Sequence, residues 1–425
     1  MRVLVISHGH PAYTSGGGEQ AAYNLYTGIN SHPRHSAWLL ARAPVQMLHP
    51  GTQVAMHNEH EYLFEGEAEV RAFSASVDLG PDGEMANLFR KLKPDVIHFH
   101  HYYKVGIELL LLARKSCPSA GIVLTLHEYM AICQNHGTMV KTDTDMRLCH
   151  AYSPRACMQC FPGTSAEDFF LREKYIKRMF AAVDLFISPG NFLAERYRAW
   201  GLDAAKICVL ENGIVAGKRL PPRKTGKGEA RTRFGFFGQV HPYKGLDWLL
   251  ETLGSLPPSV RKQISLDIHG HGMGVMDKTY RQKLEKLFKK HAGFVRFHGP
   301  YEQQELPRLM QDTDWVLMAS VWWENSPLVI QEAYKFGRPV ICPELGGMAE
   351  KVPEGIGGYL YRHRDKVALH NLVRKIVSET DDKAYGKLIA SLPDYATVEA
   401  SVAAHLQQFN KLKRHIKSGK TASQR

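Results

Sequence analysis

The sequence predicts an α/β protein of two Rossmann-like domains that face each other across a cleft. Short apolar runs of strand length alternate with helical patterns along most of the chain, which is typical of parallel sheets covered by helices on both faces. The alternation is interrupted at Lys218 to Arg233, a stretch rich in Lys, Arg, Pro and Gly, which we interpret as an exposed linker. A chain of 425 residues is also too long for a single hydrophobic core.

These features divide the chain into three parts. We expect an N-terminal domain at residues 1–215, carrying a Cys-rich insert at about 130–163, and a C-terminal domain at residues 216–395. Residues 396–425 are expected to form a helix that packs back on the N-terminal domain, followed by a basic tail. The tail either touches anionic lipid or stays solvated and disordered, and the solvated state is the favoured interpretation.

Composition and charge limit the class of protein. Hydrophobic residues make up 44% of the chain and charged residues 23%, which is ordinary for a soluble globular protein. No stretch approaches the roughly eighteen apolar residues that a membrane helix needs. The formal net charge of +12 fits solubility, anionic substrates, an anionic membrane surface or nucleic acid. Because the basic residues are scattered and no zinc-finger or RNA-binding motif occurs, we expect no nucleic-acid partner.

Cysteine usage favours a reducing cytoplasm. Seven cysteines, an odd number in a long chain, argue against a secreted disulfide scaffold. The apolar run at Met1 to Ser7 leads into a glycine loop without a cleavage-site pattern, so we interpret it as a first strand and not as a signal peptide. We therefore expect a cytoplasmic protein, with membrane contact limited to peripheral binding at the inner face. The sequence does not indicate an oligomeric state.

Two candidate ligand-binding features follow strands of the N-terminal half. Gly16-Gly17-Gly18 lies between the first strand and a helix, where glycines let the backbone approach a phosphate closely. The spacing is not that of the dinucleotide fingerprint, and a flexible loop remains an alternative. His127 and Glu128 end a later strand, at the edge of the sheet that faces the ligand crevice, although a single His is as often structural.

Four cysteines lie close together in the insert. Their pattern, C-x15-C-x7-C-x2-C, fits a tetrahedral thiolate site formed by Cys133, Cys149, Cys157 and Cys160. The insert has few large apolar residues, so a metal would supply stability that a core cannot. Zinc is the first expectation, while an iron–sulfur cluster or four metal-free thiols remain open. Four thiolates leave no open coordination position, so such a site would be structural.

The strongest candidate site is a strand–turn–helix segment in the C-terminal half. An apolar strand at Trp315 to Ser320 leads into a turn, and a helix follows with Ser326 as its expected N-cap and Pro327 as its first residue. The free N–H groups and the dipole at this helix end favour an anion. Glu324 and Glu332 frame that end and can accept hydroxyl groups. Phosphates and hydroxyls together indicate a nucleotide sugar as the ligand.

Several segments together resemble glycosyltransferase family 4, whose members are retaining enzymes of GT-B fold. Glu324 and Glu332 match the E-x7-E motif of that family, with Asn-Ser-Pro-Leu between them. The other matching segments are Ile187–Pro189, Leu210–Ile214, Phe237–Gly238, Lys244–Gly245 and Gly346–Gly347. The resemblance covers nearly the whole chain and is sharper after residue 180. The Cys-rich insert is not part of the general family pattern.

The resemblance implies a role for each matching residue. Glu324 would contact the donor sugar, Glu332 the ribose and Lys244 the diphosphate. His127 would act near the reacting carbon, so that His127, Lys244 and Glu324 are the expected catalytic residues. The expected donor-binding residues are Gly17, Gly238, Lys244, Glu324, Asn325, Ser326, Pro327, Leu328 and Glu332.

The implied function is transfer of a sugar from a nucleotide-sugar donor to a hydroxyl of a glycan or lipid-linked acceptor, with retention of configuration, in surface polysaccharide synthesis. No Asp-x-Asp pair suited to Mg²⁺ stands near the site, so we expect no metal at the donor phosphates. One position departs from the family, because Gly238 is followed by Gln239-Val-His241 where an Arg is usual. An epimerase or phosphorylase of the same architecture, or a non-catalytic nucleotide-sugar-binding protein, therefore stays open.

Overall fold

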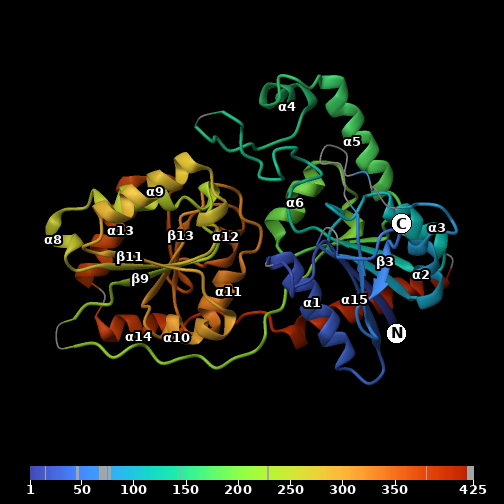
Figure 1. The fold of residues 1–425 in the computed structure, drawn as a ribbon. Coiled ribbons are helices and arrows are strands. Elements are labelled where there is room, and N and C mark those ends of the chain that lie inside the picture. Colours follow the sequence, from blue (N-terminus) through green and yellow to red (C-terminus); the bar gives the residue numbers. More distant parts are fainter. Residues whose placement is uncertain are drawn as a thin grey trace. The chain divides into compact units, whose positions relative to one another are not determined.

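The computed structural model describes residues 1–425 except residues 15, 45–46, 67–73, 75–77, 144, 227–228, 380 and 419–425. The chain divides into two compact units, each built on its own sheet (Figure 1). Unit 1 comprises Met1–Val215 and Ala396–Arg425, and unit 2 comprises Ala216–Tyr395. Much of the expected basic tail lies outside the described residues. Within the described residues, no helix combines the length and the apolar character needed to cross a bilayer.

The sheet of unit 1 has eight strands in the order β3-β4-β2-β1-β5-β6-β7-β8. Neighbouring strands are parallel, except for the antiparallel pair β3–β4 at one edge. The strands are β1 (Arg2–Ser7), β2 (Ser36–Arg42), β3 (Val54–Met56), β4 (Glu61–Phe64), β5 (Val96–Phe99), β6 (Gly121–Thr125), β7 (Leu185–Ser188) and β8 (Ile207–Val209). The central strands are buried along their whole length, as expected for a parallel sheet between helical layers.

Helices cover the sheet of unit 1, and the last of them comes from the C-terminal end of the chain (Figure 1). They are α1 (Gly17–Asn30), α2 (Glu84–Leu92), α3 (Leu109–Ser116), α4 (Pro154–Cys160), α5 (Ala166–Phe180), α6 (Asn191–Ala199), the 3-10 turn η1 (Ala204–Lys206) and α15 (Val398–Lys417). Helix α15 packs against α1, and Val402, Leu406 and Phe409 join the core that contains Val3 and Leu25. The helix is therefore an integral part of unit 1.

The sheet of unit 2 has six parallel strands in the order β11-β10-β9-β12-β13-β14. The strands are β9 (Arg233–Phe237), β10 (Ser265–His269), β11 (Val295–Gly299), β12 (Trp315–Leu317), β13 (Val340–Pro343) and β14 (Gly358–Tyr361). The helices are α7 (Leu246–Gly254), α8 (Pro258–Arg261), α9 (Lys278–Lys290), α10 (Leu306–Gln311), α11 (Leu328–Lys335), α12 (Gly346–Lys351), α13 (Lys366–Glu379) and α14 (Asp382–Ala390), with 3-10 turns η2 (Pro242–Lys244), η3 (Met273–Val275) and η4 (Gln303–Glu305). The predicted pair of Rossmann-like sheets is confirmed.

Each sheet has a point where the strand order reverses. In unit 1, β1 lies between β2 and β5, and in unit 2, β9 lies between β10 and β12. Loops that leave the carboxyl ends of such neighbouring strands separate and open a crevice, which is where open α/β sheets bind ligands. We therefore expect ligand-binding residues in the loops after β1 and β5 in unit 1 and after β9 and β12 in unit 2.

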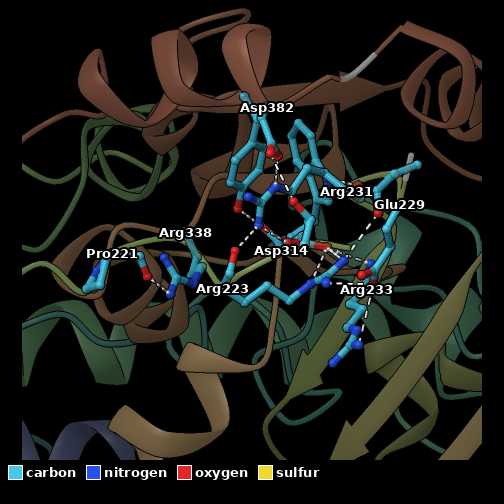
Figure 2. Close-up of polar contacts among 12 residues, drawn as sticks. Pro221, Arg223, Glu229, Arg231, Arg233, Asp314, Arg338 and Asp382 are labelled. Atoms are coloured by element: carbon cyan, nitrogen blue, oxygen red, sulfur yellow. Dashed lines mark hydrogen bonds and ion pairs between the residues drawn. The ribbon is translucent and has the colours of Figure 1, made fainter. Parts of the chain in front are cut away.

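The expectation of an exposed linker at residues 218–233 was wrong in part, because two of its arginines are buried in unit 2. Arg223 donates to Asp314 Oδ2 at 2.9 and 3.0 Å, and Arg231 lies 3.3 Å from Asp314 Oδ1. Asp314 is completely buried and directly precedes β12. Figure 2 shows both arginines in contact with its carboxylate. Arg338 is also buried and donates to the carbonyl of Pro221 at 2.9 Å. These contacts attach the segment to the sheet.

Candidate donor site and histidine cluster

In unit 2, the loops after β9 and β12 meet at the switch point of the sheet. The backbone N–H of Val321 donates to the carbonyl of Tyr243 at 2.8 Å, which ties the two loops together. Lys244 ends the first loop and Glu324 lies in the second. The topology thus brings together two residues that are 80 positions apart in the sequence.

The carboxylate of Glu324 is held by three donors. Lys244 Nζ lies 2.6 Å from Oε1, Ser320 Oγ 2.7 Å and Trp322 Nε1 3.0 Å. Because all three meet the same oxygen, Oε2 is the oxygen left to accept a hydroxyl from a ligand. Ser320 and Trp322 were not expected as site residues, since a single Ser and a single Trp beyond a strand carry no recognisable pattern.

Glu324 stays ionised although it is only 5% exposed. Burial alone would raise its pKa, but the charge and hydrogen bond of Lys244, with the hydrogen bonds from Ser320 and Trp322, hold the pKa below its ordinary value. A charged carboxylate in a partly dry site is a strong hydrogen-bond acceptor. The arrangement suits recognition of hydroxyl groups by Glu324 and of negative charge by Lys244.

Two glycines allow the backbone to close around this site. A Cβ on Gly347 would lie 1.7 Å from the carbonyl oxygen of Asn325, and the Gly347 N–H donates to Glu324 O at 2.7 Å. A Cβ on Gly245 would lie 2.1 Å from the carbonyl oxygen of Ala319, and its φ is +66°. Both positions therefore require glycine for packing.

The helix that follows the turn begins one residue later than expected. Pro327 is the N-cap of α11 and Leu328 its first residue, so Ser326 does not cap the helix. Pro327 has extended backbone and offers no side-chain acceptor, and no side chain caps this end. The first N–H groups of α11 thus keep the orientation that favours an anion.

Glu332 has a different environment from Glu324. It is half-buried on α11, and its Oε1 accepts a hydrogen bond from Gln303 Nε2 at 3.1 Å. Burial raises its pKa, although the Gln303 hydrogen bond and the nearby Lys335 act in the opposite direction. Gln303 lies in η4, far from any motif that the sequence displayed.

Gly238 and Asn325 lie where the loops turn. Gly238 directly follows β9 and has φ +130°, a backbone conformation that favours glycine. A Cβ there would contact nothing within 4 Å, so close packing does not require this glycine. Asn325 is 8% exposed. In unit 1, Gly17 begins α1, after Gly16 as its extended N-cap.

In unit 1, histidines gather at the carboxyl ends of three adjacent strands. His8 follows β1, His100 and His101 follow β5, and His127 stands two residues after β6. His8 Nε2 lies 3.2 Å from Glu19 Oε1 in the first turn of α1. Burial would raise the pKa of Glu19, but the hydrogen bond and charge of His8 lower it to about 2.

His127 lies beside the glycine loop. A Cβ on Gly18 would lie 3.7 Å from His127 Cδ2 and 3.3 Å from His8 Cε1, so the start of α1 runs along both rings. His127 Nε2 is 3.1 Å from His100 Nδ1. Burial lowers the pKa of His127 to about 3, which makes the ring neutral at physiological pH.

Glu128 forms a buried pair with His101. Their Oε1 and Nε2 atoms are 3.2 Å apart, and the backbone N–H of Met130 also donates to this carboxyl group. Burial raises the pKa of Glu128 to about 8 and lowers that of His101. The environment therefore favours the uncharged form of each group.

The four cysteines of the insert share a cavity but are not gathered as a preformed tetrahedral site. Among the described residues, no three of their sulfur atoms lie within 4.8 Å of one another. None of the four forms a disulfide, and all line one cavity of about 20 Å³. The predicted metal site on these four cysteines stays a prediction. In the described part of the insert, the regular structure consists of α4 and one bridge between Val140 and Leu148.

A different group, His10, His57 and Glu61, does bring three ligand atoms within 4.8 Å. Its hydrogen bonds argue against a metal. His10 Nδ1 accepts the N–H of Ala12 at 3.1 Å, so a neutral ring carries its proton on Nε2, which faces Glu61 Oε2 at 3.4 Å. Asn58 also donates to Glu61 Oε2, at 2.7 Å. We interpret the group as a satisfied hydrogen-bond network.

Two Rossmann-like α/β units, each built on a mainly parallel sheet, are typical of the GT-B class of proteins. The model of the family described as "Glycosyltransferase Family 4" matches residues 15–217, and that of "Glycosyl transferases group 1" matches residues 231–379. The chain belongs to glycosyltransferase family 4.

Relatives of known name are similar over different lengths. The D-inositol 3-phosphate glycosyltransferase of Streptomyces griseus is 28% identical over 245 residues, which cover 51% of this chain and 48% of that protein. The chain thus matches about half the length of such relatives. The glycogen synthase of Mycobacterium tuberculosis is 24% identical over 407 residues, covering 89% of this chain and 86% of that protein.

Solved structures share the fold over nearly the whole chain. Sucrose-phosphate synthase from Thermosynechococcus elongatus has a TM-score of 0.66 at 17% identity, covering 97% of this chain and 98% of that one. Anabaena HepE, solved in complex with UDP and glucose, has a TM-score of 0.60 at 17% identity and 99% coverage of both chains. At such identities the likeness establishes the GT-B fold alone.

Proposed function

We propose that the protein transfers a sugar from a nucleotide-sugar donor to a hydroxyl group of a glycan or lipid-linked acceptor, with retention of configuration. The observation that carries the proposal is the ion pair between Lys244 and Glu324 at the switch point of unit 2. An ammonium group there can bind a diphosphate, and the remaining oxygen of Glu324 can accept a sugar hydroxyl. Membership of the family supports these roles for Lys244 and Glu324.

A UDP-sugar is the proposed donor, since the HepE structures hold UDP, UDP-glucose, or UDP with glucose. Unit 2 would bind the nucleotide, with Glu332 at the ribose and the start of α11, from Asn325 to Leu328, at the sugar and phosphates. Gly238 would let the backbone of the other loop approach the diphosphate. Unit 1 would bind the acceptor and contribute Gly17 and His127 to the donor.

The chemistry follows from charge. Cleavage of the anomeric bond places negative charge on the leaving diphosphate and positive charge on the sugar ring. Lys244 and the N–H groups at the start of α11 would stabilise the diphosphate as preorganised electrostatics. Lys244 thus takes over the task for which the family usually also carries an Arg. Retention would come from attack of the acceptor hydroxyl on the face that the diphosphate leaves.

Substitution of Lys244 and Glu324 tests this assignment. We expect Lys244→Ala and Glu324→Ala each to lower nucleoside diphosphate release about a hundredfold in the presence of donor and acceptor, the typical loss for one preorganised contact. Lys286→Ala, on the exposed side of α9, is the matched control and should keep full activity. Near-normal turnover by either site variant would refute the assignment, and donor binding without any turnover by the wild type would favour the non-catalytic alternative.

We also propose that the insert holds a structural zinc ion on Cys133, Cys149, Cys157 and Cys160. Burial raises the thiol pKa of Cys133 to about 11 and that of Cys157 to about 12, and the neighbouring thiols raise the pKa of Cys157 further. A divalent cation would reverse this cost by stabilising thiolates, which are its preferred ligands. The loop would have to draw the four sulfur atoms together around the ion.

Metal analysis tests the zinc proposal. We expect about one zinc per chain in protein purified without chelator, the stoichiometry of a four-thiolate site. Cys157→Ser should lose the zinc and lower the melting temperature of unit 1, whereas Cys208→Ser, a half-buried thiol on β8, should keep the zinc. Sub-stoichiometric zinc and iron in the wild-type protein would refute the proposal.

We propose a cytoplasmic enzyme of surface polysaccharide synthesis that meets a lipid-linked acceptor at the inner face of the membrane. The last turns of α15 carry the exposed residues Lys411, Arg414 and Lys417, which fit an anionic lipid surface, whereas Lys413 is paired with Asp95. Flotation with vesicles tests this: the protein should rise with vesicles that contain anionic phosphatidylglycerol and not with neutral ones. Failure to float with either would remove the membrane proposal without affecting the donor site.

A further inference from the structure

His100 links the histidine cluster to the interior of unit 1. It directly follows β5, and its ring is 2% exposed. Its Nδ1 lies 3.1 Å from His127 Nε2, and the two rings are stacked with centroids 5.3 Å apart. The imidazole of His100 therefore restricts the orientation of the His127 ring through this hydrogen bond.

This hydrogen bond constrains the protonation state of His127. Burial lowers the pKa of both rings, so both are neutral at physiological pH. Two neutral rings share one proton across the bond, and the ring that accepts it must carry its own proton on its other nitrogen. The state of His100 thus decides whether His127 Nδ1 is a donor or an acceptor.

The other nitrogen of His100 requires a partner that the described residues do not provide. Nε2 is buried and has no hydrogen bond to any described residue. Leaving such an atom unsatisfied costs about 1–3 kcal/mol. His100 also lines a cavity of about 10 Å³, which is close to the smallest volume that holds one water molecule.

The lining of this cavity is polar enough to bind water. Besides His100, the polar residues that line it are Asn24 on α1, Asn212 in the loop after β8, and Ser401 and His405 on α15. His405 Nδ1 lies 2.7 Å from the carbonyl oxygen of Ser401, so that nitrogen must donate. Burial lowers the pKa of His405 to about 4, and its neutral ring therefore offers Nε2 as an acceptor.

We propose that a water molecule bound in this cavity satisfies His100 Nε2, and that His100 in turn holds His127 in one tautomer and one orientation. His100 is then a positioning residue, and α15 supplies part of its support through His405 and Ser401. The consequence for catalysis rests on the proposed function, in which His127 acts near the reacting carbon. The effect of His100 on the tautomer of His127 does not depend on the proposed function.

Replacement of His100 separates these two consequences. His100→Phe removes both nitrogens, and we expect kcat for transfer to fall about 10–100-fold, the typical loss when a supporting hydrogen bond is removed, with the KM for the donor within about twofold. His100→Asn places an amide near the position of Nδ1 and should restore most of kcat. The ¹⁵N spectrum of labelled histidines should show one tautomer of His127 in the wild type and in His100→Asn, and an average of both in His100→Phe.

A second variant tests the cavity without touching the pair of rings. Asn24→Leu fills the cavity with an apolar group and should exclude the water. We expect kcat to fall, as in His100→Phe, and His127 to populate both tautomers. His291→Phe, a buried histidine of unit 2, should change neither readout.

Unchanged kcat together with an unchanged His127 spectrum in His100→Phe, or in Asn24→Leu if His100→Phe fails to fold, would overturn the proposal. If the wild type releases no nucleoside diphosphate with any donor, the proposed function fails, while the His127 spectrum still tests this inference.

Discussion

Glu324 shows how much of a site depends on contacts that no local pattern reveals. The E-x7-E spacing and the Lys244–Gly245 segment were visible in the sequence, so both residues could be named as candidates. Their ion pair was not predicted, because it joins loops 80 residues apart that only the strand order brings together. Ser320 and Trp322, which complete the environment of the carboxylate, gave no signal at all.

Gly347 offers a test at the level of a single atom. A methyl group there would overlap the carbonyl oxygen of Asn325, so Gly347→Ala must displace the loop that carries Glu324. We expect a loss of about 1–3 kcal/mol in the free energy of unfolding, as for other overpacked positions, together with weaker donor binding. Urea denaturation and a donor titration measure the two effects.

The same substitution at Gly386 is the control. This glycine lies inside α14, and a Cβ there would meet nothing within 4 Å. Gly386→Ala should therefore stabilise unit 2 by about 0.5–1 kcal/mol through the reduced entropy of the unfolded chain. If both variants changed stability in the same direction, the assignment of Gly347 to a close backbone approach would be wrong.

At the scale of elements, the helices and strands were predictable because their patterns are local, whereas the attachment of the segment before β9 was not. Arg223 and Arg231 occur in a basic, Pro- and Gly-rich stretch, which resembles a solvated linker by composition. Their partner Asp314 directly precedes β12, more than 80 residues later in the sequence. Composition therefore gave the wrong environment for both side chains.

The buried network around Asp314 makes a strong prediction about stability (Figure 2). Asp314→Ala leaves two arginine side chains, each about 5–6% exposed, without their shared carboxylate. Removal of one partner of a buried ion pair costs about 3–5 kcal/mol, so thermal unfolding of unit 2 should shift to much lower temperature. Asp394→Ala removes a fully exposed partner of Arg219 and should leave the unfolding temperature of unit 2 nearly unchanged. Equal effects of the two variants would contradict the structural role of the network.

At the scale of the whole molecule, the number and type of sheets followed from the sequence, because parallel strands buried on both faces leave continuous apolar runs. The sequence did not reveal how deeply the side chains of α15 are buried in the core of unit 1. Phe409 of α15 is completely buried in the core that holds the strands of unit 1.

Phe409 tests whether the chain behaves as two units that unfold separately. Phe409→Ala should lower the stability of unit 1 by about 3–5 kcal/mol through the cavity it leaves, with no effect on unit 2. Calorimetry should show one transition that shifts and one that does not. Leu171→Ala, at a position that is 62% exposed on α5, should shift neither. A common shift of all transitions in Phe409→Ala would show that the two units unfold as one.

The central claim is that Lys244 and Glu324 hold the diphosphate and the sugar of the donor, and calorimetric titration with UDP and UDP-sugars tests it most directly. The wild type should bind both ligands. Lys244→Ala should bind each about 10–100-fold more weakly, since it loses a charged hydrogen bond to phosphate. Glu324→Gln should weaken the UDP-sugar but leave UDP itself almost unaffected. Equal affinity of the wild type and Lys244→Ala for both ligands would contradict the account.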